Sequence, residues 1–235
     1  MSWTEEATSN NDVNERDFIL SVDGHEVPGV YWTPQGGAEK LVMLGHGGTT
    51  HKRTDYIVEV AKLLCARGIA AVAIDGPGHG DRRTFDWTGD QTEFARAWND
   101  GGGTDTVVAD WRATLDFIEA EFGAQPTGWW GLSMGTMMGL PVTATDERIK
   151  VALLGLMGNW GPNGDDLMRL APQISCPVRF LVQWDDEIVP RDSCLVLFDE
   201  LGTAKKTLHG NPGRHQAVPQ FEVVGSVDYL ERYLG

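Results

Sequence analysis

The sequence predicts an α/β protein built on a mostly parallel, twisted sheet with helices on both faces, and three observations support this. The expected strands are apolar throughout rather than alternating, which is typical of a sheet buried on both sides. They alternate with amphipathic helical segments from residue 40 onward. Before that point, two β-rich runs at 17–22 and 26–32 are joined by Asp23-Gly24, whose residue types suit a tight turn. We therefore expect an antiparallel N-terminal hairpin at one edge of the sheet.

From residue 40 to the C-terminus, strands and helices follow one another without an internal repeat. Short apolar runs such as KLVMLG, IAAVAID and KVALLGL indicate strands. The strands are expected at 40–45, 69–75, 127–132, 150–156, 178–184 and 206–209. Apolar residues at helical spacing predict helices at 56–64, 108–122, 134–144, 193–201 and 218–234. Gly68 and Gly123 are expected to end the first two of these helices.

The chain of 235 residues is expected to form one domain over 15–235, preceded by a loose polar tail over 1–14. Two segments fit neither a strand nor a core helix, namely 81–104 and 158–173. Both leave the carboxyl ends of predicted strands, which is where ligands bind in open α/β sheets. We therefore expect them to be short lids over a site.

Composition excludes several classes of function. The 19 Lys and Arg against 34 Asp and Glu give a net charge of −15 with no basic run, which argues against nucleic acid and against anionic membranes. Cys65, Cys176 and Cys194 have no C-x-x-C spacing, so we expect buried free thiols and neither a disulfide framework nor a metal site. The acidic first residues are unlike a signal peptide, and no apolar run approaches the ~18 residues of a membrane span. We expect a cytoplasmic protein.

The most informative motif is Gly131-Leu132-Ser133-Met134-Gly135. It lies between a predicted strand and a predicted helix, which is the setting that a nucleophile elbow requires. The turn is so tight that the residues two away from the nucleophile must be small. The helix that begins there points its free N–H groups at the reacting centre. We therefore predict that Ser133 is a nucleophile.

A second glycine-rich motif, Gly45-His46-Gly47-Gly48-Thr49, follows the strand at 40–45. Glycines there let backbone N–H groups approach a substrate oxygen. The elbow needs one such donor beside the N–H of Met134, and we expect Gly48 to supply it, with Thr49 as the alternative. His46 is expected to pack and hydrogen-bond within the turn rather than to transfer protons.

A serine hydroxyl is a weak nucleophile that needs a base, and the base must be oriented by a third group. Three consecutive acids, Asp185, Asp186 and Glu187, follow one predicted strand, and His215 follows the last one. The chain order of serine, acid and histidine is the order expected on this architecture. The residues alone leave the three acids as alternatives, since acids before a helix also act as N-caps. His209 likewise competes with His215.

These motifs resemble those of the α/β-hydrolase superfamily, and the likeness runs from about Val22 to the C-terminus. It rests on the oxyanion-loop motif at 46–48, the D-x-P-G-H-G turn at 75–80, the elbow at 131–135, the D-x-x-V-P element at 186–190 and the P-G-x-H element at 212–215. The resemblance implies that Asp186 is the triad acid and His215 the triad base. The chain is similar to compact serine esterases and to dienelactone-hydrolase-like members, although it has Ser rather than Cys as nucleophile and lacks a large cap.

The expected function is therefore hydrolysis of carboxylic esters with a short or medium acyl chain, through an acyl-enzyme and without a cofactor. The same triad also serves amides, thioesters, C–C bonds and acyl transfer, and a non-catalytic ligand-binding protein is a further alternative. We expect a small-molecule ester as the partner, and homo-oligomer formation is left open. Trp87, Trp160 and Trp184 are expected to line an apolar substrate pocket, although core packing is an alternative for each.

Overall fold

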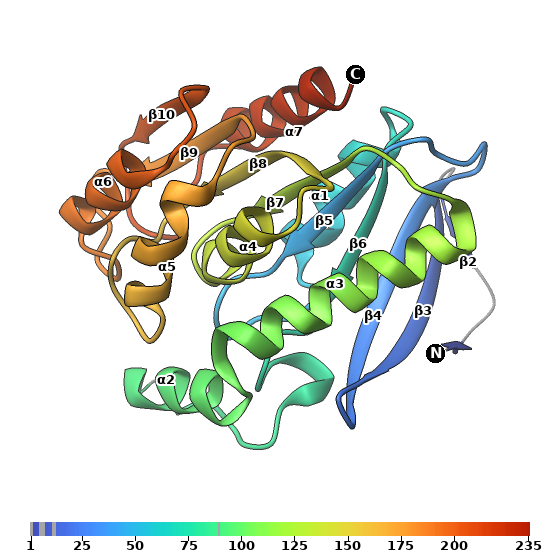
Figure 1. Ribbon diagram of the computed structural model, residues 1–235, viewed down its shortest axis with the longest axis horizontal. Helices are drawn as coiled ribbons and strands as arrows, with labels where there is room; N and C mark the ends of the chain where they lie inside the picture. Colours follow the sequence, from blue (N-terminus) through green and yellow to red (C-terminus); the bar gives the residue numbers. More distant parts are fainter. Residues whose placement is uncertain (1, 5–7, 11–12, 89) are drawn as a thin grey trace.

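The fold is a twisted mixed sheet between two layers of helices (Figure 1). The computed structural model describes residues 2–4, 8–10, 13–88 and 90–235. The sheet consists of β1 (Ser2–Trp3), β2 (Thr8–Asn10), β3 (Val13–Val22), β4 (His25–Pro34), β5 (Leu41–Gly45), β6 (Ala70–Ile74), β7 (Thr127–Gly131), β8 (Ile149–Gly155), β9 (Val178–Gln183) and β10 (Lys206–Asn211).

The strand order is β1-β3-β4-β6-β5-β7-β8-β9-β10, with β2 paired to β3. Six neighbouring strands are parallel, in the order β6, β5, β7, β8, β9 and β10. In contrast, β3 pairs antiparallel with β4, and β4 pairs antiparallel with β6. The predicted α/β class and the antiparallel N-terminal hairpin are thus confirmed. Because β5 and β7 are neighbours, the glycine-rich loop after β5 lies beside the turn after β7.

Helices cover both faces of this sheet. They are α1 (Asp55–Cys65), α2 (Gln91–Asp100), α3 (Gly103–Phe122), α4 (Met134–Thr145), α5 (Gly164–Leu170), α6 (Arg191–Glu200) and α7 (Gln220–Leu234), with short 3-10 helices η1 (Gly80–Arg82) and η2 (Ala171–Gln173). One hydrophobic core joins the sheet to α1 and α7. The other joins the opposite face to α3, α4, α5 and α6. This two-sided burial is what the continuous apolar strands predict.

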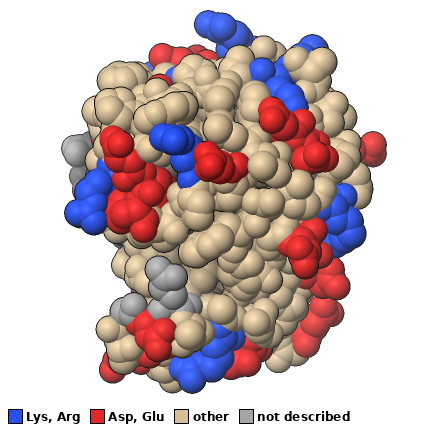
Figure 2. All heavy atoms as spheres, turned by 90° about the vertical axis from the view of Figure 1, so that its left-hand side faces the viewer, with Lys and Arg blue, Asp and Glu red and all other residues tan. Residues whose placement is uncertain are grey.

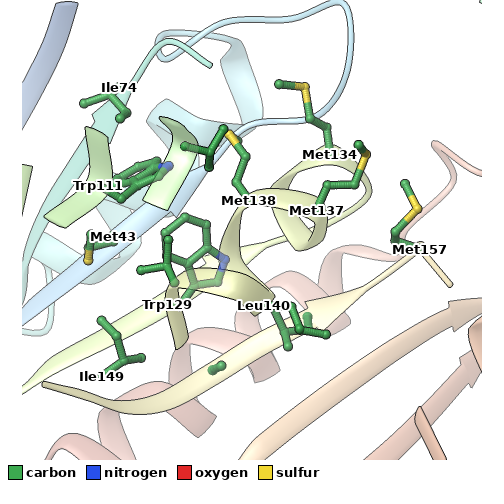
Figure 3. Packing of buried hydrophobic residues seen from close by; sticks show 14 of the residues in the cluster. Met43, Ile74, Trp111, Trp129, Met134, Met137, Met138, Leu140, Ile149 and Met157 are labelled. Atoms are coloured by element: carbon green, nitrogen blue, oxygen red, sulfur yellow. The ribbon is translucent and has the colours of Figure 1, made fainter. Parts of the chain in front are cut away.

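The core behind α4 is built from aromatic rings and methionines (Figure 3). Trp111 and Trp129 are fully buried and meet edge to face, with ring centroids 4.7 Å apart. In Figure 3, Met138 points toward these tryptophans, while Met137 points toward Met157 on the far side of the helix. Unbranched methionines fill irregular space well, and here they pack the helix that follows Ser133.

Two expectations need correction. Parts of the expected tail 1–14 form strands, because residues 2–3 and 8–10 pair with β3. Trp3 anchors the first of these strands, since its ring packs against Phe18 and Phe117 and lies under the guanidinium of Arg16. Residues 1, 5–7 and 11–12 of this tail lie outside the described part. The lid segments 81–104 and 158–173 also contain helices, namely α2 within the first and α5 within the second.

The segment before α5 is fastened to α4 at a proline. Pro141 lies inside α4 and has no N–H, so the carbonyl of Met137 loses its usual partner four residues on. The side-chain Nδ2 of Asn163 donates a hydrogen bond to that carbonyl at 3.1 Å, and Asn163 is buried. The carbonyl that lacks a hydrogen bond within α4 thus binds the second lid segment instead.

The Asn163→Ala change should lower the free energy of unfolding by about 1–3 kcal/mol, because it leaves the buried Met137 carbonyl unpaired. In a Pro141→Ala background, the new N–H can bond the carbonyl within the helix, and the effect of Asn163→Ala should shrink. Urea unfolding of the two single variants and the double variant measures the coupling, expected at about 0.5–3 kcal/mol. Strictly additive effects would contradict this account.

Candidate active site

Ser133 lies on a sharp turn between β7 and α4. Its backbone has φ 58° and ψ −121°, a strained conformation for a residue with a side chain. The N–H of Ser133 donates to the carbonyl of Gly155 at the end of β8, which fixes the turn against the sheet. A Cβ atom on Gly131 would lie 2.7 Å from the carbonyl oxygen of Gly135, and one on Gly135 would lie 2.4 Å from that of Gly45. Only glycine fits either position.

The structure brings Ser133, His215 and Asp186 into one hydrogen-bonded chain. Ser133 Oγ lies 2.9 Å from His215 Nε2, and His215 Nδ1 lies 2.7 Å from Asp186 Oδ2. The second carboxylate oxygen, Asp186 Oδ1, accepts the N–H groups of Ile188 and Val189, both at 2.8 Å. The Asp186 side chain is 2% exposed and that of His215 is 9% exposed. Asp186 therefore holds the imidazole from a fixed, nearly dry position.

The alternatives for the acid and the base lie elsewhere in the hydrogen-bond network. Asp185 and Glu187 bind backbone N–H groups of the segment that carries His215, at Gly213 and at His215 itself. His209 lies 3.6 Å from Glu222 on α7. Of the residues that the sequence left open, Asp186 and His215 are the pair that reaches Ser133.

The loop after β5 is fixed by the side chain of Tyr56, which the sequence did not single out. The N–H of Gly47 donates to the hydroxyl of Tyr56, while the Thr50 hydroxyl donates to the carbonyl of Gly47 at 2.8 Å. The N–H of Gly47 is therefore occupied, which favours the next one, that of Gly48, as a donor to substrate. Tyr56 could not be recognised in advance because it belongs to the apolar stripe of α1 and reaches the loop only in the folded chain.

His46 packs and hydrogen-bonds within this loop, in line with the role expected from the sequence. Its Nε2 accepts the N–H of Gly76 at 2.9 Å, so the proton is on Nδ1, which donates to the carbonyl of Gly47 at 2.8 Å. Burial, reinforced by the nearby His79, lowers the pKa of His46 to about 4. The neutral ring therefore links the loop after β5 to the loop after β6.

An ion cluster of buried Lys52 and Asp75 with exposed Asp81 joins the same two loops. Lys52 Nζ lies 2.6 Å from Asp75 Oδ2 and 2.5 Å from Asp81 Oδ2, and Asp75 also accepts the N–H groups of Lys52 and Asp81 at 2.9 Å each. Burial alone would raise the pKa of Asp75, but the hydrogen bonds from Lys52 and from the Asp81 N–H hold it below its usual value. Asp75 is thus a paired, ionised group that ties the loop before α1 to the D-x-P-G-H-G turn.

The first lid segment lies directly against the oxyanion-loop motif. A Cβ atom on Gly48 would lie 3.0 Å from the ring of Phe94 on α2. Phe94 belongs to an aromatic group in which Trp87 lies 6.4 Å from Phe94 and 5.1 Å from His79, measured between ring centroids. Trp87 is thus a neighbour of Phe94, the ring that borders the predicted donor Gly48. The sequence did not point to Phe94, whose contact with the loop depends on how α2 folds back.

The other two expected pocket tryptophans have different surroundings. Trp160, at the start of the second lid segment, is half-buried and packs against the core that contains α4 and α5. Trp184 is 48% exposed, lies over Gly210, and carries the guanidinium of Arg191 4.6 Å from its ring centroid. Trp184 thus forms part of the outer surface next to the Asp186 turn.

The side of the molecule that carries α2, α5 and α6 has an uncharged centre (Figure 2). In this view, charged side chains lie above the tan centre, along its right-hand side and on the lower lobe, and the surface is indented above that lobe. Although the chain has a net charge of −15, its acids do not gather over this part of the surface.

The described residues form no cluster of metal-ligating side chains, and the pKa of each thiol is raised. Among the described residues, no group of three or more His, Cys, Asp or Glu side chains is arranged to hold a metal ion. Burial raises the pKa of Cys65 and of Cys194 to about 12, and that of Cys176 to about 11, so these thiols are poor nucleophiles. In the described chain, the helices are all too short or too polar to cross a bilayer.

The chain is similar to solved structures of esterases. No curated protein matches the chain. A cold-adapted esterase from an Arctic intertidal metagenomic library, solved with bound PEG, is 62% identical over the whole of both chains, with a TM-score of 0.95. At 19% identity, the acetyl xylan esterase from Paenibacillus sp. R4 shares the fold with a TM-score of 0.74, over 97% of this chain and 87% of the other.

The family comparison covers most of the chain. The profile described as "Alpha/beta hydrolase family" matches residues 41–226, from β5 to the middle of α7. Together with the full-length relative at 62% identity, this match shows that the protein belongs to the α/β-hydrolase family.

Proposed function

We propose that this protein is a serine esterase that hydrolyses small carboxylic esters through an acyl-enzyme. The observation that carries the proposal is the hydrogen-bonded chain from Ser133 Oγ through His215 to Asp186, with Ser133 on a strained turn between β7 and α4. The 62% identical relative is itself described as an esterase, which favours an ester over an amide, a thioester or a C–C bond.

In the proposed mechanism, His215 Nε2 takes the proton of Ser133 as Oγ attacks the ester carbonyl. Asp186 keeps the imidazole in the tautomer with its proton on Nδ1 and stabilises the imidazolium that forms. The protonated His215 then gives a proton to the leaving alcohol, and the acyl group stays on Ser133. A water molecule, activated by the same histidine, releases the acid and restores the serine.

The charge that develops on the carbonyl oxygen needs donors that are already in place. We propose the N–H groups of Gly48 and Met134, each worth about 2.7–4 kcal/mol by analogy with measured oxyanion donors. The contact between Gly135 and Gly45 supports this pairing, because it holds the elbow and the loop after β5 at van der Waals distance. No metal or organic cofactor is required for these steps.

The surroundings of the site favour an uncharged, largely apolar substrate. Trp87 and Phe94 border the oxyanion loop, and Trp160 stands at the base of the second lid segment. We propose that Trp87 and Trp160 contact substrate directly and that Trp184 contributes at the outer margin. We propose that the acyl chain of the substrate is short or medium in length.

We also propose that the enzyme works in the cytoplasm on small molecules and binds neither nucleic acid nor membrane. Its three thiols are free, as expected in a reducing compartment, and its net charge is −15. Formation of a homo-oligomer is compatible with the proposal but is not needed for it, because Ser133, Asp186 and His215 come from one chain.

The proposal is tested by hydrolysis of p-nitrophenyl esters of increasing acyl length. The Ser133→Ala variant should lose at least about 10⁴-fold in kcat, since the nucleophile is gone, while its thermal unfolding stays within a few degrees of the wild type. Comparable turnover in both proteins would refute Ser133 as nucleophile.

The role of Trp160 is tested with the same ester series. Trp160→Ala should shift the optimum toward longer acyl chains, because removing the indole enlarges the pocket. Phe221→Ala serves as the control, since Phe221 is an exposed aromatic on α7, on the opposite face of the sheet. Identical relative rates across the series for Trp160→Ala and wild type would count against a substrate contact.

The free energy of unfolding should depend on pH because the pKa of His46, in the loop after β5, is lowered by folding. Its pKa is about 4 in the folded protein against an ordinary value of 6.5, so the unfolded chain binds the extra proton between these limits. Stability should therefore fall as the pH falls through this window, by up to about 1.4 kcal/mol per pH unit for this residue.

Urea unfolding at several values between pH 7 and pH 4 measures this slope. His46→Gln should have a flatter slope than wild type. Equal slopes for wild type and His46→Gln would show that His46 does not titrate as described.

A further inference from the structure

We propose that Glu187 is a positioning residue that fixes the backbone of the catalytic histidine, and this inference rests on the proposed esterase function. Glu187 Oε2 accepts the backbone N–H of His215 at 3.0 Å. Its neighbour Asp186 holds the imidazole of the same residue at 2.7 Å. The carboxylates of two consecutive residues thus bind His215: Asp186 binds its ring, and Glu187 binds its main-chain N–H.

The segment that carries His215 depends on such contacts because it follows β10, at the edge of the sheet. Gln183, at the end of β9, holds the segment by its carbonyl groups: its Nε2 donates to the carbonyls of Arg214 and Ala217 at 3.2 and 2.9 Å. The N–H groups of the same segment donate to carboxylates, and the acceptor for the N–H of His215 is Glu187.

Asp185 forms a second, similar contact nearby and so provides a matched comparison. Its Oδ2 accepts the N–H of Gly213 at 3.1 Å, and its own N–H donates to the carbonyl of Gly213 at 3.1 Å. Both acids leave the same turn and both are exposed, but the Asp185 contact is two residues before the histidine. If the loop merely needed tethers, the two acids would be interchangeable.

Three charged groups face this part of the loop. Besides Asp186 and Asp185, Arg214 places its Nε 3.2 Å from Glu187 Oε1, on the solvent side. Arg214 is 75% exposed, so this ion pair is screened by water and contributes little to the position of Glu187. The N–H of His215 is the main cause of the lowered pKa of Glu187, which keeps this acceptor ionised.

A small displacement of the histidine should affect chemistry more than substrate binding. The imidazole must lie within hydrogen-bond reach of Ser133 Oγ to take its proton, and this geometry matters in the transition state. Ground-state binding of the ester does not use the His215 main chain. Loss of the Glu187 contact should therefore lower kcat and leave KM nearly unchanged.

The experiment compares four variants with wild type on one p-nitrophenyl ester: Glu187→Ala, Glu187→Gln, Asp185→Ala and Arg214→Ala. Glu187→Ala should lower kcat about 10- to 100-fold with KM within about twofold. Glu187→Gln keeps a carbonyl oxygen at the end of a side chain of equal length and should recover most of the loss. Asp185→Ala and Arg214→Ala should stay within about threefold of wild type in kcat.

Thermal unfolding of the same proteins separates positioning from stability. Glu187→Ala and Asp185→Ala should lower the unfolding midpoint by similar amounts, because each removes one comparable hydrogen-bond acceptor. Equal losses of kcat in these two variants would reduce Glu187 to a loop tether and overturn the inference. So would a Glu187→Gln variant as slow as Glu187→Ala, since the acceptor atom would then not be what matters.

The Ser133→Ala variant keeps this test apart from the test of the function. If Ser133→Ala is inactive and Glu187→Ala is fully active, the positioning role fails while the esterase proposal stands. If Ser133→Ala retains turnover, the fault lies in the proposed mechanism itself.

Discussion

The site depends on the contact of three backbones at the carboxyl end of the sheet. Gly45 of β5, Gly131 of β7 and Gly135 of α4 approach so closely that a single methyl group on Gly131 or Gly135 would collide with a main-chain oxygen. This contact sets the direction of α4, gives Ser133 its strained backbone and holds the loop after β5 beside it. The remaining site residues are arranged around a turn that only glycine permits.

Two separate groups of contacts support the site, one near the oxyanion loop and one near His215. Near the oxyanion loop it is buried and polar, with neutral His46 and the ion cluster of Lys52 and Asp75 between the loops after β5 and β6. Near His215 it is exposed and acidic, with carboxylates on main-chain N–H groups. Buried polar groups hold the loops in place because an unpaired buried group costs free energy. Exposed carboxylates compete with water, so they hold a loop only where the hydrogen bond is well aligned.

Much of this architecture could be predicted from the sequence, because periodicity and glycine stops mark strands and helices directly. The predicted helix over 108–122 begins five residues earlier in the structure, at Gly103, and ends at Phe122 as expected. Local motifs also pointed to Ser133 and narrowed the acid to three neighbours. What could not be predicted is long-range: Tyr56 on Gly47, Phe94 on Gly48 and Asn163 on Met137 join elements whose meeting depends on the whole fold. The strand at Ser2–Trp3 was missed for the same reason, since its partner β3 supplies the pairing.

Because β10 is the edge strand of the sheet, His215 can lose its position while Ser133 keeps its own. Ser133 follows a central strand with neighbours on both sides, whereas His215 follows a strand that pairs only with β9 in the described sheet. Local opening of an edge strand requires less free energy than global unfolding. A brief detachment of this edge would take the base away from the serine while the core stayed packed. We therefore expect the proposed triad to come apart before the fold does, at the edge of the sheet rather than at its centre.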